Sequence, residues 1–237
     1  MITKELQDIL WEYRSQGWVP EPAAKKLLAR AGLPVTRHLW SKTLEEALCF
    51  ADEIGYPLVA KVVSSEAVHK SEQGGVALGL GNPLELTAAY ERFRQFGGFA
   101  GVLVEEMLTG LELIVGAKID FQFGPVILLG MGGTRAEIYR DIALRMAPLD
   151  EAVVASMITG LRGHRLLEGF RGENPVNIPE LTRLIIAFSE LVMEMAPQID
   201  SLDLNPLMCT GKKCVIADAR IMLSHPPEEG RGATGQD

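Results

Sequence analysis

A short segment of the chain, His69 to Val76, places a histidine and a lysine just before two consecutive glycines. A neutral imidazole is a good nucleophile at physiological pH, and Lys70 adds a positive charge beside it. Backbone N–H groups around Gly74 and Gly75 can approach an anion closely because glycine has no Cβ. The combination indicates phosphate chemistry, although a histidine beside a glycine pair is, taken alone, most often an ordinary surface loop.

Two basic residues elsewhere in the chain are candidates for neutralising phosphate charge, which nucleotide phosphoryl transfer requires. Lys61 interrupts a β-branched run over 58–63. A lysine inside a strand is costly unless its ammonium finds an anion, and the alternative is an edge strand with a solvated lysine. Arg145 lies between apolar Leu144 and Met146 and is either a phosphate-binding arginine or an amphipathic edge position.

Two further groups complete a possible nucleotide site. Asn205 and Asp218 lie in short apolar segments and offer the hard oxygen ligands that Mg²⁺ takes in proteins; the alternative is a turn-forming Asn-Pro and a solvated aspartate. Glu105-Glu106-Met107 separates two predicted strands. It is either a hinge that contacts adenine through backbone groups or a strand end with solvated acids.

Composition limits the class of protein. The chain has 237 residues, 47% of them hydrophobic, and a net charge of −8. This acidity argues against a nucleic-acid polymer as partner. Three cysteines without CxxC spacing favour reduced thiols over a zinc site or disulfides. The N-terminus has no signal-like apolar region and the apolar runs are too short to span a bilayer, so we expect a soluble cytoplasmic protein without a membrane partner.

The elements that would position these residues follow from periodicity and from Gly and Pro positions. Helices are predicted over 3–16, 23–31, 41–54, 84–96, 149–160 and 180–195, and strands over 35–40, 58–63, 76–80, 99–106, 111–120, 125–129, 201–206 and 215–220. Because helices and strands intermix without strict βα alternation, the pattern favours an α+β fold. Walker A, GxSxG and HExxH sequences are absent, which argues against a P-loop NTPase, an α/β-hydrolase and a zincin.

Together these segments resemble the ATP-grasp (beta) subunit of ADP-forming acetyl-CoA synthetase, within the acyl-CoA synthetase (NDP-forming) family and the succinyl-CoA synthetase superfamily. The resemblance covers about residues 20–222. It rests on 55–64 (GYPLVAKVVS), 69–76 (HKSEQGGV), 112–116 (ELIVG), 123–126 (FGPV), 130–133 (GMGG), 145–149 (RMAPL), 202–207 (LDLNPL) and 218–220 (DAR), with Asp120, Glu137 and Asp141 between them.

The resemblance implies an ATP-grasp fold in which two α+β lobes hold the nucleotide between them. We expect an N-terminal helical extension over 1–19, a first lobe with the glycine loop over 20–104, a second lobe with the metal site over 105–225 and a disordered tail over 226–237. The implied cofactors are ATP or ADP and Mg²⁺. The implied partner is a CoA-binding alpha subunit in a hetero-oligomer, because the sequence shows no CoA-binding domain. The chain would then be a separate subunit or a fragment of a fused protein.

The resemblance also assigns roles to individual residues. His69 would carry the phosphoryl group transiently, and Lys61 and Arg145 would neutralise it. Asn205 and Asp218 would hold Mg²⁺. The remaining nucleotide contacts would come from Gly74, Gly75, Glu105, Glu106, Met107 and Glu112.

The implied reaction is acyl-CoA + ADP + phosphate ⇌ carboxylic acid + ATP + CoA, which makes the chain an acid–thiol ligase subunit that is active only with its partner. One departure from the family pattern is Ser201, where a glutamate is usual. Two alternatives therefore stay open: a catalytically silent nucleotide-binding module, and an ATP-grasp ligase that forms an acyl phosphate directly.

Overall fold

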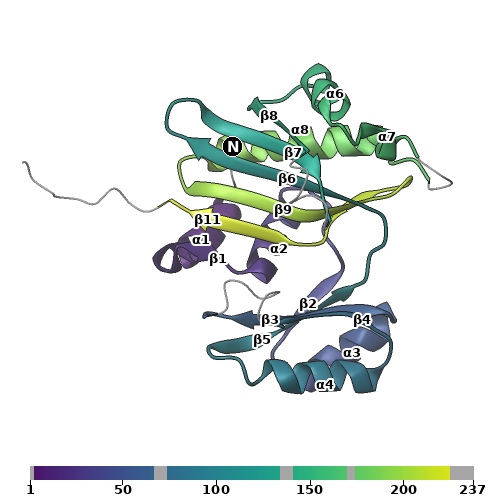
Figure 1. The fold of residues 1–237 in the computed structure, drawn as a ribbon. Helices are drawn as coiled ribbons and strands as arrows, with labels where there is room; N and C mark the ends of the chain where they lie inside the picture. The colour runs from purple at the N-terminus through teal and green to yellow at the C-terminus, as the bar shows by residue number, and fades with distance from the viewer. Residues whose placement is uncertain (1–2, 67–73, 134–140, 170–173, 225–237) are drawn as a thin grey trace, which may run out of the picture.

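The computed structural model describes residues 3–66, 74–133, 141–169 and 174–224. It contains two lobes, each built on its own antiparallel sheet and its own hydrophobic core. The larger sheet lies above the smaller one in Figure 1. The predictions for His69, Glu137 and the tail over 226–237 fall outside the described residues.

The larger lobe has a seven-stranded sheet in the order β1-β11-β9-β6-β7-β8, with β10 paired to β9. Its strands are β1 (Trp18–Val19), β6 (Leu111–Asp120), β7 (Gly124–Met131), β8 (Ile142–Met146), β9 (Ile199–Cys209), β10 (Cys214–Ile216) and β11 (Ala219–Leu223). Its helical segments are α1 (Lys4–Glu12), the 3₁₀ turn η1 (Arg14–Gln16), α2 (Glu21–Arg30), α6 (Glu151–Gly160), α7 (His164–Leu167) and α8 (Ile178–Met195).

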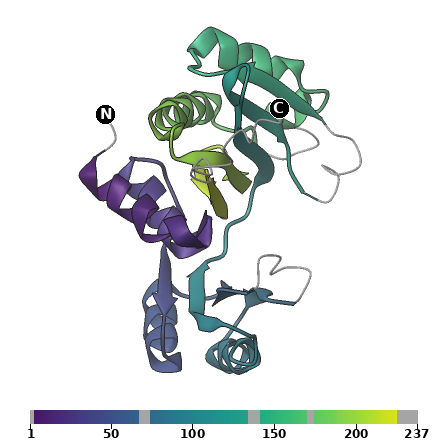
Figure 2. The same ribbon diagram turned by 90° about the vertical axis from the view of Figure 1, so that its left-hand side faces the viewer.

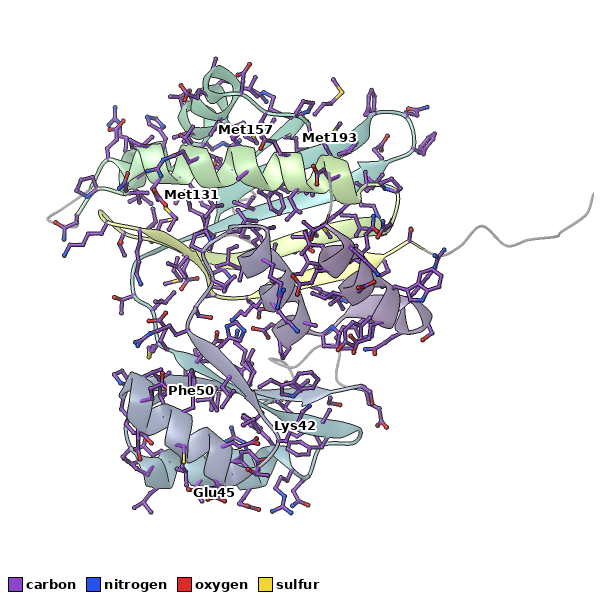
Figure 3. All side chains as sticks on the ribbon, turned by 180° about the vertical axis from the view of Figure 1, so that it is seen from behind. Lys42, Glu45, Phe50, Met131, Met157 and Met193 are labelled. Atoms are coloured by element: carbon purple, nitrogen blue, oxygen red, sulfur yellow. The ribbon has the colours of Figure 1, made fainter. Side chains whose placement is uncertain are left out.

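The helices of this lobe share a single core with the sheet. Leu181, Ile185 and Phe188 of α8 are buried with strand residues such as Leu113 and Leu202. Figure 3 shows Met157 of α6 and Met193 of α8 in the helical layer over the sheet; Met157 is fully buried, whereas Met193 is 41% exposed. Helices α1 and α2 belong to the same core. The sequence predicts that the first lobe begins at residue 20, whereas in the structure α2 packs in the core of the larger lobe.

The smaller lobe has a four-stranded sheet in the order β2-β5-β3-β4. Its strands are β2 (His38–Ser41), β3 (Leu58–Ser64), β4 (Val76–Leu80) and β5 (Phe99–Glu106), and its helices are α3 (Leu44–Ile54) and α4 (Pro83–Phe93). Both helices cover the sheet face that points away from the larger lobe, as the two perpendicular views show (Figures 1 and 2). Helix α3 begins at a capping box in which Thr43 and Glu46 satisfy each other's backbone N–H groups.

Alternation along the small sheet divides its residues between two faces. Ala60, Val62 and Val104 pack in the core against α3 and α4. Lys61 and Glu105 are their neighbours along β3 and β5, so these two residues point to the opposite face, toward the larger lobe. The sheet thus presents a buried cation and a buried anion at the junction between the lobes.

The chain between α2 and β2 ties the two lobes together. The backbone N–H of Thr36 donates to the carbonyl of Ile216 at 3.2 Å, and the N–H of Ile216 donates to the carbonyl of Pro34 at 2.9 Å. Val35 also forms a parallel bridge to Ile216. These contacts bring the connection between β10 and β11 close to the small sheet.

Several predicted elements differ from the structure. The predicted strand over 215–220 is two strands, β10 and β11, which are separated at Ala217 and Asp218. The predicted strand over 201–206 is the middle of the longer strand β9, and β8 was not predicted. All three cysteines are free thiols, as expected. Among the described residues, no helix is both long and apolar enough to cross a membrane.

Candidate functional site

The Lys61 ammonium lies at the lobe junction and is fully engaged by protein acceptors. Its Nζ donates to Glu21 Oε1 at 2.6 Å and to the Ala217 carbonyl at 2.9 Å, and it lies 2.7 Å from Glu105 Oε1. These three short contacts match the three donors that an ammonium group has. The residue is only 6% exposed, so the anion that a buried strand lysine needs comes from within the chain in this structure.

Burial by itself would lower the pKa of Lys61. The carboxylates of Glu21, Asp218 and Glu105 outweigh that effect and hold the pKa of Lys61 well above its usual value. The side chain is therefore a cation at every physiological pH.

A second buried lysine, Lys25, completes the arrangement. Its Nζ donates to Thr36 Oγ1 at 2.9 Å, lies 3.2 Å from Glu21 Oε1 and forms a very short contact with Glu105 Oε2. The Thr36 hydroxyl also donates to Glu105 Oε2, at 2.6 Å. We call Glu21, Lys25, Lys61 and Glu105 the charge cluster; it joins α2 of the larger lobe to β3 and β5 of the smaller one.

The sequence forms this cluster through simple spacings. Glu21 and Lys25 are four residues apart on α2 and therefore share one face of the helix. Lys61 and Glu105 share one face of the small sheet because Lys61 pairs with Leu103, which is two residues from Glu105 along β5. Sequence reasoning missed Glu21, Lys25 and Thr36. The available signal was the Glu-x-x-x-Lys spacing, which also occurs as an ordinary ion pair on exposed helices.

The two predicted metal ligands occupy opposing backbone positions, and one of them, Asp218, lies beside the cluster. Asp218 follows β10, and its flanking residues Ile216 and Ala219 pair with Leu207 and Leu204. Asn205 lies between those two partners on β9, so the backbone register places Asn205 opposite Asp218. Asp218 Oδ2 is 3.5 Å from Lys61 Nζ, and the Asp218 side chain is 39% exposed.

This pair fits a magnesium ion that is shared with phosphate oxygens. One carboxylate and one amide oxygen are hard ligands, and Mg²⁺ usually takes only one or two protein ligands when it binds with a nucleotide. Within the described part of the chain, no group of three or more His, Cys, Asp or Glu residues is arranged to hold a metal ion.

The predicted hinge is divided between two environments. The Glu105 carboxylate belongs to the charge cluster, and its backbone pairs with His38 on one side and Val59 on the other. The Glu106 N–H donates to the Arg37 carbonyl at 3.1 Å. Met107 follows the end of β5 and is 39% exposed. Of the three residues, Met107 is the one that lies beyond the strand.

The glycine loop is anchored next to Lys61. The Gly75 carbonyl accepts a hydrogen bond from the Val62 N–H at 2.8 Å, and Lys61 pairs with Val76 across β3 and β4. Gly74 has a φ of 74°, a conformation that glycine adopts without strain. Residues 67–73, including His69, connect these two strands and are not described.

Glu112 lies at the start of β6, against the glycine-rich segment 130–133. Its carbonyl accepts a hydrogen bond from the Gly132 N–H at 2.8 Å. A Cβ on Gly132 would lie 2.8 Å from the Glu112 carbonyl carbon, so the close approach requires glycine there. The structure places the Glu112 carboxylate beside Gly133.

Arg145 is not brought together with the other candidates. It lies on the edge strand β8, and its guanidinium donates to the Leu144 carbonyl and to Ser156 Oγ of α6, both at 2.8 Å. Its partner across the ladder is Ile127, a residue of the large core. Arg145 therefore points to the helical face of the sheet, and its predicted role has no supporting contact among the described residues.

Comparisons with known proteins agree with this architecture. Residues 11–223 match the model of the ATP-grasp domain family. The chain is 37% identical over 211 residues to the beta subunit of acetate–CoA ligase [ADP-forming] I from Pyrococcus furiosus, an alignment that covers 86% of this chain and 90% of the relative. A longer relative, 4-hydroxybutyrate–CoA ligase [ADP-forming] from Nitrosopumilus maritimus, is also 37% identical, over 30% of its length.

Solved structures give the same result. Acetyl-coenzyme A synthetase 1 from Candidatus Korarchaeum cryptofilum, in complex with coenzyme A and Ca-AMPCP, is 37% identical, with a TM-score of 0.87 and coverage of 92% of this chain and 99% of that chain. A second structure of that enzyme contains Mg-AMPPCP, with its phosphohistidine segment pointing towards the nucleotide-binding site; it is 36% identical, covers 92% of this chain and all of that chain, and has a TM-score of 0.82. The expected ATP-grasp fold is therefore confirmed, and the chain belongs to the ATP-grasp family that includes the beta subunits of ADP-forming acetate–CoA ligases.

Proposed function

We propose that the chain is the nucleotide-binding subunit of an ADP-forming acyl-CoA synthetase. The observation that carries this proposal is the approach of the Lys61 ammonium to within 3.5 Å of Asp218 Oδ2 at the lobe junction, in a chain that belongs to a family of such subunits. A cation beside hard oxygen ligands suits a nucleoside polyphosphate and Mg²⁺.

In the proposed reaction, the phosphoryl group passes between His69 and ADP. In the direction of ATP synthesis, the P–N bond to the imidazole breaks as a terminal oxygen of ADP forms a new P–O bond, and the released ring nitrogen takes up one proton from solvent to give neutral imidazole. Lys61 would orient the phosphates and offset their charge. Asn205 and Asp218 would hold Mg²⁺, which when bound neutralises charge on the phosphates. An alpha subunit would supply the CoA and acyl sites, as the relatives' designation as beta subunits suggests.

The remaining assignments are proposals at the residue level. Gly74 and Gly75 would bring backbone near the phosphates, and the chain at Glu105 to Met107, with Glu112, would contact the nucleoside. The geometry favours Met107 for the base, because the backbone of Glu105 is paired on both sides. A role for Arg145 stays a prediction.

The phosphohistidine step can be tested on the chain itself. Incubation with Mg²⁺ and γ-labelled ATP is expected to give acid-labile, base-stable label on the wild-type protein and on His164→Ala, but none on His69→Ala. His164 is a matched control because it lies on α7 of the larger lobe, where its Nδ1 is 2.8 Å from the Leu161 carbonyl. Label that persists in His69→Ala would refute the relay role.

One observation favours a second candidate, a silent nucleotide-binding module. Ser201 of β9 pairs with Lys118 and Met222 and replaces the glutamate usual in the family. Nucleotide binding without label, and without turnover when an alpha partner is added, would support this candidate. Turnover without any label would instead support direct formation of an acyl phosphate.

A further inference from the structure

The charge cluster balances its own charge. Two carboxylates, Glu21 and Glu105, contact two ammonium groups, Lys25 and Lys61, and all four residues are at most 6% exposed. Buried charges are tolerated when they are paired and hydrogen-bonded in this way. Removing any one of the four charged side chains would leave one uncompensated charge in the protein interior, where the low dielectric constant screens it poorly.

Phosphate binding by Lys61 therefore has a structural requirement. Each of the three ammonium donors already has a protein acceptor within 2.9 Å. A phosphate oxygen can gain a full hydrogen bond only if one of these contacts is given up or shared. If Lys61 gives up its contact with Glu21 or Glu105, that buried carboxylate must be compensated by another cation.

Lys25 is placed to be that cation. It contacts Glu21 Oε1, the same oxygen that accepts from Lys61, and it contacts the other oxygen of Glu105. Lys25 is completely buried and is fixed further by the Thr36 hydroxyl. It cannot reach out to a ligand itself without leaving these contacts.

We propose that Lys25 is a positioning residue for nucleotide binding: it acts as the resident counter-ion of Glu21 and Glu105, so that Lys61 can turn from them to a polyphosphate oxygen. The inference rests on the proposed function and deepens it. Under this proposal α2 takes part in phosphate binding although none of its side chains contacts the ligand.

The test compares Lys25→Met with Lys26→Met, its exposed neighbour on the same helix. Calorimetry measures the dissociation constants of ADP and of adenosine in saturating Mg²⁺. Lys25→Met leaves two carboxylates to compete with phosphate for Lys61, so ADP binding is expected to weaken roughly 10- to 100-fold, the effect of losing one charge-assisted contact. Adenosine affinity is expected to stay within about twofold of wild type, and Lys26→Met is expected to match wild type for both ligands.

A double variant, Lys25→Met/Glu21→Gln, removes one charge of each sign and restores the balance, and neither residue is among the proposed nucleotide contacts. It is expected to bind ADP within about threefold of wild type, and it serves as the decisive test if the single variant fails to fold. The inference is overturned if Lys25→Met binds ADP like Lys26→Met, if ADP and adenosine weaken equally, or if the double variant binds ADP 10-fold or more below wild type. Absence of ADP binding in the wild-type chain would instead refute the proposed function, and with it the inference.

Discussion

Replacement of Lys61 by methionine tests the charge cluster through stability. Methionine preserves most of the volume of the lysine stem, so the packing of β3 changes little. The substitution leaves Glu21 and Glu105 with Lys25 alone, one buried carboxylate in excess. Breaking a buried ion pair by removing one partner costs about 3–5 kcal/mol, and for a chain of this size that corresponds to a fall in Tm of roughly 6–20 °C.

A matched control lies on the larger sheet. Lys118 is also a strand lysine in an ion pair, 2.6 Å from Asp200, but the two side chains are 62% and 51% exposed. Exposed pairs contribute about 0–1 kcal/mol, so Lys118→Met should lower Tm by only a few degrees. Urea unfolding and thermal melts of both variants measure the difference. Equal losses in the two variants, or a loss below about 1 kcal/mol for Lys61→Met, would show that the cluster is not a buried ionic network.

Two further predictions concern pH and the glycine segment. Burial, and to a smaller extent the nearby Lys25 ammonium, lowers the pKa of His38, and this outweighs the opposite effects of the Thr36 carbonyl and the cluster carboxylates. As the pH falls below about 6.5, His38 is therefore protonated in the unfolded chain before it is protonated in the folded chain. The free energy of unfolding should therefore decrease from pH 7 to pH 5, and His38→Gln should flatten that part of the curve; an unchanged slope in urea titrations would contradict the assignment. Gly132→Ala would place a Cβ 2.8 Å from the backbone of Glu112 and should cost about 1–3 kcal/mol, whereas Gly160→Ala, with nothing within 4 Å at the end of α6, should be neutral or stabilising by up to about 1 kcal/mol. Chemical denaturation measures the free energy of unfolding of both variants. No loss of stability in Gly132→Ala would show that the backbones at Gly132 and Glu112 can move apart.

Local signals were sufficient for most elements of the fold. Helix α3 illustrates this, because Thr43, Glu46 and Gly55 mark its two ends in the sequence and serve as its caps in the structure. Strand β8 was missed because its residues Ile142, Leu144 and Met146 are exposed on one face and the strand is held by pairing with β7. That pairing is a long-range contact that no local pattern reveals.

The candidate site was predicted only in part for the same reason. Lys61 was recognisable because a cation in an apolar strand requires an anion, but the sequence could not identify Glu21 and Glu105 as the anions. Those contacts depend on how α2 packs against the small sheet. Arg145 stays a prediction: its apolar neighbours suggested a site, and the ladder register turns it to the helical face, where it contacts Ser156.

The central claim is that a Mg²⁺–nucleotide complex binds at the junction of Lys61, Asn205 and Asp218. The most direct measurement is calorimetric titration of the wild-type chain and of Asp218→Asn with ADP, each with and without Mg²⁺. The proposal predicts 1:1 binding that Mg²⁺ strengthens in the wild type, and loss of most of that strengthening in Asp218→Asn. Binding that is independent of Mg²⁺, or an identical dependence on Mg²⁺ in the two proteins, would contradict it.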